Sequence, residues 1–195
     1  MKGTSAVTMK RQVIIIFPLF VLLLLSLGAC SGTSSAFNQF YQGRTLVVSV
    51  VTMERVPELR YRTVDLQQKV HHYRITPSEE DMELVLMRLK VQNHTATSAI
   101  VNIDEQAAEL RDFLGNGYFP ININERVQEV DAPENPAEER MIVFLWNRTF
   151  EDGTSKAFEL QRGYGIDGWM VFEAPKDTEF RELRWRAGDS LSIEF

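Results

Sequence analysis

The sequence predicts an all-β protein, an antiparallel β-sandwich of about seven to nine strands behind an N-terminal export segment. Its composition is globular, with 44% hydrophobic and 25% charged residues in a chain of 195. Short apolar runs alternate with polar residues at a period of two, and turn-forming residues separate the runs. No amphipathic stretch favours a helix of more than about ten residues.

Two strand candidates open the domain. Residues 46–51, LVVSVV, are apolar and β-branched, which favours a strand. Residues 82–93, MELVLMRLKVQN, give the longest strand pattern, with large apolar side chains at even positions up to Leu86 and at odd positions from Met87. Because a shift of one residue reverses the face of a strand, this slip predicts a β-bulge between Leu86 and Met87.

Further strands follow to the end of the chain. The candidates are short and apolar, and they are 98–104, 107–111, 118–124, 141–146, 169–174, 180–186 and 191–195. The continuously apolar MIVFLW at 141–146 predicts a strand buried on both faces. Short helices compete only at 64–72 and 104–111.

Turn-forming residues lie between these runs. LGNG at 114–117 predicts a hairpin loop, and 151–154 and 187–189 predict tight turns. Residues 131–139 carry four carboxylates, which are Asp131, Glu134, Glu138 and Glu139. We interpret this segment as a solvated acidic loop and a possible binding surface. Calcium binding competes, but the segment lacks the glycine turn and ligand order of a calcium loop.

The first thirty residues have the pattern of an export signal. The Lys10-Arg11 pair is followed by an uncharged apolar stretch at 13–27, which is shorter than the roughly 20 residues of a membrane-spanning helix. The stretch ends in four residues that resemble the lipobox of bacterial lipoproteins, namely Leu27, Gly28, Ala29 and Cys30. An uncleaved membrane helix is the alternative interpretation.

The lipobox resemblance implies a lipid anchor. It implies that the chain is cut before Cys30 and that the Cys30 thiol is diacylated, and two acyl chains hold a protein stably on a bilayer. The implied organisation is a signal peptide at 1–29, a lipidated tether at 30–44 and a sandwich domain at 45–195. The domain would face outside the cytoplasm in the bacterial cell envelope. The membrane would be the outer membrane of a two-membrane bacterium, or otherwise the outer face of the plasma membrane.

Charge and composition exclude several classes of function. The 21 basic and 27 acidic residues give a net charge of −6, which argues against a nucleic-acid partner. Cys30 is the single cysteine, so the chain has no internal disulfide and no multi-cysteine zinc site. His71 and His72 are adjacent, and neighbours in a strand point to opposite faces. We predict no metal and no cofactor, because the ligand spacing of a metal site is missing. We also predict no catalysis, because no nucleophile motif is present.

Four stretches of the domain resemble a known family, and in chain order they are 85–93, 109–118, 168–175 and 183–195. They resemble the immunoglobulin-like domain of unknown function found in secreted bacterial antigens and lipoproteins. The resemblance implies an immunoglobulin-like sandwich and transfers no catalytic residue. Within it, Gly168 would leave room for a neighbouring strand. Residues 53–75 and 125–140 depart from the family pattern.

Three functional hypotheses fit these observations. The first is a lipid-anchored binding or envelope-accessory module whose partner is an envelope protein or polymer. The second is an envelope-acting hydrolase with an unrecognised carboxylate or histidine site. The third is a structural spacer, which would expose neither a sizeable apolar patch nor a pocket. The first is favoured because sandwiches offer loops and edges for binding more often than active sites.

The lipobox predicts the mass of the mature protein. Protein extracted from membranes should have the mass of residues 30–195 plus acyl groups, because cleavage and acylation both occur at Cys30. The Cys30→Ala variant should keep the precursor mass and carry no acyl group. Intact-mass spectrometry measures both. A full-length mass without acyl groups in the unchanged protein would instead indicate an uncleaved membrane helix.

Overall fold

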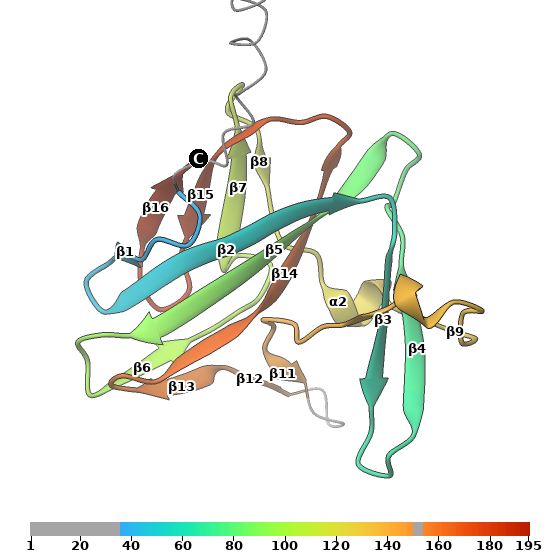
Figure 1. Cartoon of the computed structure of the whole chain (residues 1–195). Helices are drawn as coiled ribbons and strands as arrows, with labels where there is room; N and C mark the ends of the chain where they lie inside the picture. Colours follow the sequence, from blue (N-terminus) through green and yellow to red (C-terminus); the bar gives the residue numbers. More distant parts are fainter. Residues whose placement is uncertain (1–35, 150–153) are drawn as a thin grey trace, which may run out of the picture. The chain divides into compact units, whose positions relative to one another are not determined.

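The computed structural model describes residues 36–149 and 154–195, which belong to one compact unit built mainly of strands. Its front sheet is antiparallel and has the strand order β1-β2-β5-β14 (Figure 1). The members are β1 (Tyr41–Gln42), β2 (Leu46–Val56), β5 (Met82–Asn93) and β14 (Gly165–Pro175).

A back sheet with the order β16-β15-β7-β8 lies behind the front sheet in Figure 1. Its members are β16 (Leu191–Glu194), β15 (Phe180–Trp185), β7 (Ala108–Asp112) and β8 (Gly117–Tyr118). The antiparallel pair β6 (Ser98–Val101) and β13 (Phe158–Gln161) contributes to the same core. The main hydrophobic cluster lies between the sheets, with Phe172 and Trp185 fully buried. The predicted antiparallel β-sandwich is confirmed.

A four-stranded arm with the order β10-β3-β4-β9 extends from the sandwich (Figure 1). Its members are β3 (Leu59–Val64), β4 (Val70–Ile75), β9 (Gln128–Val130) and β10 (Arg140–Met141). Because β3 follows β2 and β4 precedes β5, the arm prolongs the two central strands of the front sheet. The helix considered at 64–72 is wrong, since these residues form the end of the β3–β4 hairpin.

Short elements fill the connections, and they are α2 (Ile123–Arg126), a 3-10 helix at Pro136–Glu138, β11 (Arg148–Thr149) and β12 (Ser155–Lys156). The expected strand at 118–124 is divided between β8 and α2, because the Asn122 side chain accepts the Asn124 N–H and caps the helix. Residues 107–111 lie mostly in β7, so the helix considered at 104–111 is wrong.

Strand β5 is buried on both faces over its first half. Its odd-numbered side chains, including Val85 and Met87, pack into the main cluster. Leu84 and Leu86 point the other way and pack into a second cluster, which covers the opposite face of the front sheet. This cluster draws on the arm and later segments, and its buried members are Leu59, Tyr61, Ile75, Leu84, Leu86, Ile123, Ile142 and Val171.

The predicted β-bulge between Leu86 and Met87 is therefore wrong. Strand β5 pairs with β14 in a continuous register across both residues. The register shift lies instead in the neighbouring strand β2, between Val50 and Thr52. Burial on two faces at one end of β5 and on one face at the other produces the same apolar pattern as a bulge.

The prediction of a buried strand at 141–146 is also wrong. Met141 and Val143 are 74% and 71% exposed, so a strand buried on both faces is wrong. The segment runs along the free edge of β14, where the Trp169 N–H donates to the Val143 carbonyl at 2.8 Å. A Cβ on Gly168 would lie 2.7 Å from that carbonyl oxygen, so glycine permits the close approach.

The predicted turns are confirmed where they are described. LGNG at 114–117 closes the β7–β8 hairpin, and Gly115 has a φ of +91°, which side chains disfavour. The turn at 187–189 joins β15 to β16, and Asp189 accepts hydrogen bonds of 2.7 and 2.9 Å from two backbone N–H groups at the start of β2. Most of the turn at 151–154 lies outside the described residues.

Burial on both faces of β5 predicts the stability of two adjacent variants. Leu86→Ala and Met87→Ala should each lower the free energy of unfolding by about 2–5 kcal/mol, because each leaves a cavity in a different cluster. Lys90→Ala, at an exposed position of the same strand, should change it by less than about 0.5 kcal/mol. Urea unfolding of the three variants measures the differences. A small effect at either Leu86 or Met87 would contradict the two-cluster packing.

Candidate functional site

The predicted lipidation site lies outside the described residues. This holds for Cys30 and for the other lipobox positions, Leu27, Gly28 and Ala29. Within residues 36–149 and 154–195, no helix has the length and apolar character needed to cross a membrane. The candidate sites of the domain lie on the arm and on the back sheet.

The predicted binding loop at 131–139 is only partly solvated. Asp131, Glu134 and Glu138 are exposed, but Glu139 is buried. Both Glu139 carboxylate oxygens lie within 2.9 Å of His72 Nδ1, so this side chain fastens the loop to β4 instead of facing a ligand. In the described part of the chain, no group of three His, Cys, Asp or Glu side chains is arranged to hold a metal ion.

The tip of the arm displays apolar side chains on a fixed turn. Asp65 Oδ1 accepts hydrogen bonds of 2.9 and 2.8 Å from the backbone N–H groups two and four residues later. Leu66 lies in this turn and is 95% exposed. Val64 and Val70 pair across the hairpin and are also exposed. Exposed apolar side chains on an ordered turn suit contact with another molecule.

His71 connects this turn to β9. Its Nδ1 lies 3.0 Å from Glu129 Oε1, and its Nε2 lies 3.0 Å from Asp65 Oδ2. The hydrogen bond with Glu129 and then that with Asp65 raise the pKa of His71, while the same bonds lower the pKa of both carboxyls. Because both ring nitrogens are engaged, His71 is poorly placed to take a proton from a substrate.

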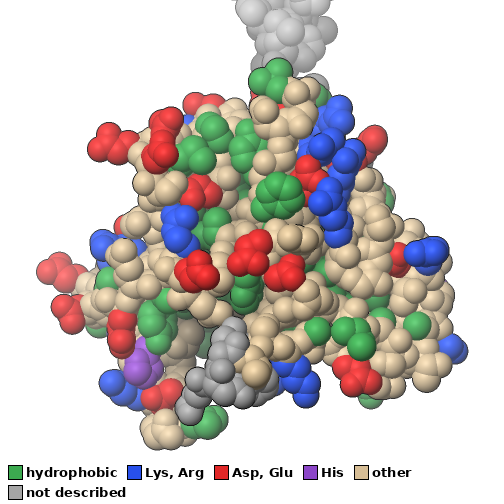
Figure 2. All heavy atoms as spheres, turned by 180° about the vertical axis from the view of Figure 1, so that it is seen from behind, with side chains coloured by type: hydrophobic (Ala, Val, Ile, Leu, Met, Phe, Trp, Pro, Cys, Tyr) green, Lys and Arg blue, Asp and Glu red, His purple; other side chains and the backbone are tan. Residues whose placement is uncertain are grey.

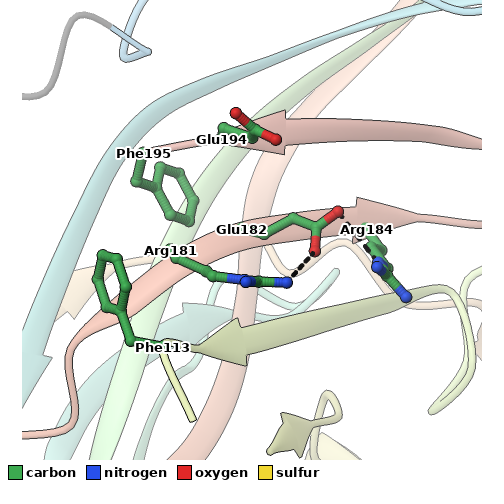
Figure 3. A pocket seen from close by; sticks show the side chains of 6 residues that line it. All are labelled: Phe113, Arg181, Glu182, Arg184, Glu194 and Phe195. Carbon is green, nitrogen blue, oxygen red and sulfur yellow. Dashed lines mark hydrogen bonds and ion pairs between the residues drawn. The ribbon is translucent and has the colours of Figure 1, made fainter. Parts of the chain in front are cut away.

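The outer face of the back sheet has a hollow of about 390 Å³ (Figure 3). Two aromatic rings and four charged side chains line it, and these are Phe113, Arg181, Glu182, Arg184, Glu194 and Phe195. Glu182 accepts hydrogen bonds from the Ser192 hydroxyl and from Arg184 Nε, the latter at 3.0 Å, and these bonds lower its pKa. The hollow is therefore polar, with charges of both signs.

Ion pairs continue from the hollow across the same face. Glu109 on β7 accepts hydrogen bonds from Arg111 Nε at 2.7 Å and from Arg186 beyond the end of β15. The view from behind in Figure 2 shows basic side chains gathered in a column on this face. Exposed pairs contribute little singly, but a network holds its side chains in fixed positions. The outer face thus presents ordered arginines in a chain whose net charge is negative.

The tip of the β7–β8 hairpin flanks the hollow and resembles the tip of the arm. Asp112 accepts hydrogen bonds from the Asn116 backbone at 2.8 Å, the Asn116 amide at 2.7 Å and the Tyr118 hydroxyl at 3.1 Å. Burial raises the pKa of Asp112, but these bonds outweigh it and the pKa lies below its ordinary value. The loop displays Phe113 and Leu114, which are 63% and 89% exposed.

The charge and composition of the sequence identify the acidic loop at 131–139 as a possible binding surface, but they do not identify the two hairpin tips. Each tip has an aspartate followed at once by apolar residues, Asp65-Leu66 and Asp112-Phe113-Leu114. An aspartate favours a turn because it accepts hydrogen bonds from nearby backbone N–H groups, and an apolar residue in a tight turn has no core to enter. That pairing is the sequence signal that identifies these sites.

The His71 contacts predict its titration. The His71 ring should titrate above pH 6.5, since two carboxylates stabilise its charged form. Its contribution to the stability of the arm is therefore complete below pH 6.5 and is lost as the pH rises through the higher folded-state pKa. Glu129→Gln should lower that pKa. NMR titration of the ring measures both values, with His71→Gln assigning the resonance, and a midpoint at or below 6.5 would contradict the contacts.

Comparisons with known proteins give remote likenesses only. No family model and no curated protein matches the chain. The yjhA protein from Bacillus subtilis is 14% identical, with 78% of this chain and 83% of that chain covered and a TM-score of 0.45. The ycdA protein of Bacillus subtilis, provisionally described as a lipoprotein, is 9% identical over 80% of this chain and 38% of that chain, with a TM-score of 0.43.

A third solved structure is an uncharacterised β-sandwich protein from Clostridium difficile 630. It is 10% identical, covers 82% of this chain and 91% of that chain, and has a TM-score of 0.40. The β-sandwich architecture of this chain rests on the strand pairing described above. The resemblances to the lipobox and to the immunoglobulin-like family stay predictions.

Proposed function

We propose that the chain is a lipid-anchored binding module of the bacterial envelope that faces outside the cytoplasm. The anchor is the acylated Cys30, and the partner is an envelope protein or polymer bound by the arm. The export pattern of the first thirty residues supports the anchor, and the β-sandwich with a projecting arm supports a binding role without catalysis.

The exposed tip of the arm is the observation that carries this proposal. Leu66 is 95% exposed although its turn is held by hydrogen bonds from Asp65. Full burial of a leucine side chain contributes about 1.5–3 kcal/mol, so covering Leu66 would add a favourable term of this size to the free energy of binding. The turn is already ordered before binding, which reduces the entropy lost on association.

The arm tip and the start of the described chain lie at different ends of the domain. Phe37 stacks on Phe195, so the chain enters beside its own C-terminus. Figure 1 places the C-terminus and the end of the β3–β4 hairpin on opposite sides of the sandwich. A domain anchored through Cys30 would therefore hold the arm away from the membrane, where an envelope partner is accessible.

The competing hypotheses receive less support. A spacer should have neither a pocket nor an exposed apolar patch, whereas the domain has a hollow of about 390 Å³ and two apolar tips. A hydrolase with a histidine site would need a ring nitrogen facing a cleft. His71 has both ring nitrogens bonded to carboxylates, and it does not line the hollow.

Photo-crosslinking in intact cells tests the proposed function. A photoreactive residue at Leu66 of the full-length protein should form one defined crosslinked species, because the partner covers the tip. Ile100 is also exposed but lies on β6 in the sandwich, and it is the matched control. With the photoreactive residue placed at Val64 instead, Leu66→Asp should reduce the yield of the crosslinked species by about tenfold, since it places a charge in an apolar contact. Equal crosslinking at Leu66 and Ile100 would contradict binding by the arm.

A further inference from the structure

We propose that the β7–β8 tip is a second membrane contact. Phe113 and Leu114 enter the headgroup region of the bilayer, and Arg181 binds a lipid phosphate beside them. This inference rests on the lipid anchor at Cys30 that the proposed function contains. It assigns a phospholipid surface as the partner of the hollow shown in Figure 3.

The shape of the tip supports insertion. Phe113 and Leu114 are adjacent, largely exposed and outside the hydrophobic clusters of the described residues. Asp112 holds their loop through three hydrogen bonds, so the loop keeps the two side chains on display. A bilayer interface favours aromatic and leucine side chains and accepts a shallow apolar projection of this kind.

The tip lies at the end of the domain where the chain enters. Ala36 is buried in the main cluster, and the Phe37 and Phe195 rings stack with centroids 5.7 Å apart. Phe195 and Phe113 line the same hollow and flank one end of it in Figure 3. Figure 1 shows the C-terminus and the β7–β8 tip at this end.

The length of chain before Ala36 makes the bilayer the occupant. Six residue steps separate Cys30 from Ala36, and an extended chain of that length spans at most about 22 Å. Acyl chains on Cys30 that are buried in the bilayer therefore keep this end of the domain close to the membrane surface. Such tethering makes the second contact intramolecular, so a weak tip is sufficient.

The charges beside the tip fit a phospholipid headgroup. Arg181 is half exposed, and its Nη2 lies 3.9 Å from Glu182 Oε2, whereas Arg184 holds Glu182 at 3.0 Å. Arg181 is thus the arginine of the hollow that is available to a phosphate. Glu194 also lines the hollow and repels an anion. The mixed lining therefore favours a headgroup with both a phosphate and an ammonium group over a purely anionic one.

Lipid quenching of a single fluorophore tests the contact. The full-length, acylated Leu114→Cys protein is labelled with an environment-sensitive dye and reconstituted into phosphatidylethanolamine–phosphatidylglycerol vesicles that contain a quencher near the headgroups. Leu66→Cys is the matched control, because it has similar exposure in a similar hairpin turn. We expect quenching at position 114 to exceed that at position 66 by at least about twofold, with a blue-shifted emission.

Two results would overturn the inference and leave the anchor intact. One is equal quenching at positions 114 and 66 on vesicle-bound protein. The other is a blue shift at position 114 without lipid quenching, which would indicate that a protein, including a second copy of this chain, covers the tip. Failure of the anchor itself is distinguishable with protein that carries no added cysteine. If Cys30 is not acylated, its free thiol reacts with the dye, and the protein does not stay on the vesicles.

Two variants near the label distinguish the apolar contribution to membrane contact from the ionic one. In the labelled Leu114→Cys protein, Phe113→Ser should reduce quenching by at least about twofold, because it removes the second inserted side chain. Arg181→Gln should also reduce quenching in the same phosphatidylethanolamine–phosphatidylglycerol vesicles, because it removes the group that binds the lipid phosphate. Ile100→Ser, at an exposed position on β6, should leave it unchanged. Near-ultraviolet circular dichroism confirms that each variant is folded, and unchanged quenching in both the Phe113→Ser and the Arg181→Gln variant would overturn the proposal.

Discussion

Burial of strand β5 on both faces is the constraint on which the rest of the structure depends. Val85 and Met87 pack into the cluster between the two sheets, while Leu84 and Leu86 pack under the arm. Among the described residues, the back sheet packs only on the main cluster, and the arm packs only on the second cluster. Each of them therefore depends on the front sheet for its packing. A domain of this size gains stability from such sharing, because one strand supplies buried apolar area to two clusters.

Carboxylates hold the turns at the ends of the molecule by hydrogen bonds, while apolar clusters hold its centre together. Asp65 and Asp112 fix two hairpin tips, and Asp189 ties the start of β2 to the C-terminal hairpin. Each accepts hydrogen bonds from nearby backbone N–H groups that the ladders leave unpaired. The apolar side chains at the two tips stay exposed, because the turns are stable without burying them.

The strands with one buried face were predictable from the sequence. Alternation at a period of two located 180–186 and 191–195, and a continuous apolar, β-branched run located 46–51. The arm was not predicted in this way, because β3 alternates over only four residues, Leu59 to Arg62, and β4 contains the adjacent His71 and His72, which place polar side chains on both of its faces. The buried partner of Glu139 was also hidden, since His72 lies 67 residues away in the sequence. Of the candidate sites, the Cys30 motif is local, whereas the hollow joins side chains from β15 and β16, the C-terminal residue and the β7–β8 loop.

The placement of the arm on two adjacent central strands has a consequence for how such domains can diverge. Its base is fixed, because Leu59, Tyr61 and Ile75 belong to the second cluster. Beyond that base, residues 64–70 belong to neither hydrophobic cluster, and hairpin tips tolerate insertion. Alternation of faces allows growth only by pairs of residues in each strand, which lengthens the arm by roughly 7 Å per step. Lineages that carry this fold can therefore change the reach of the arm in discrete increments while the sandwich and its attachment stay the same.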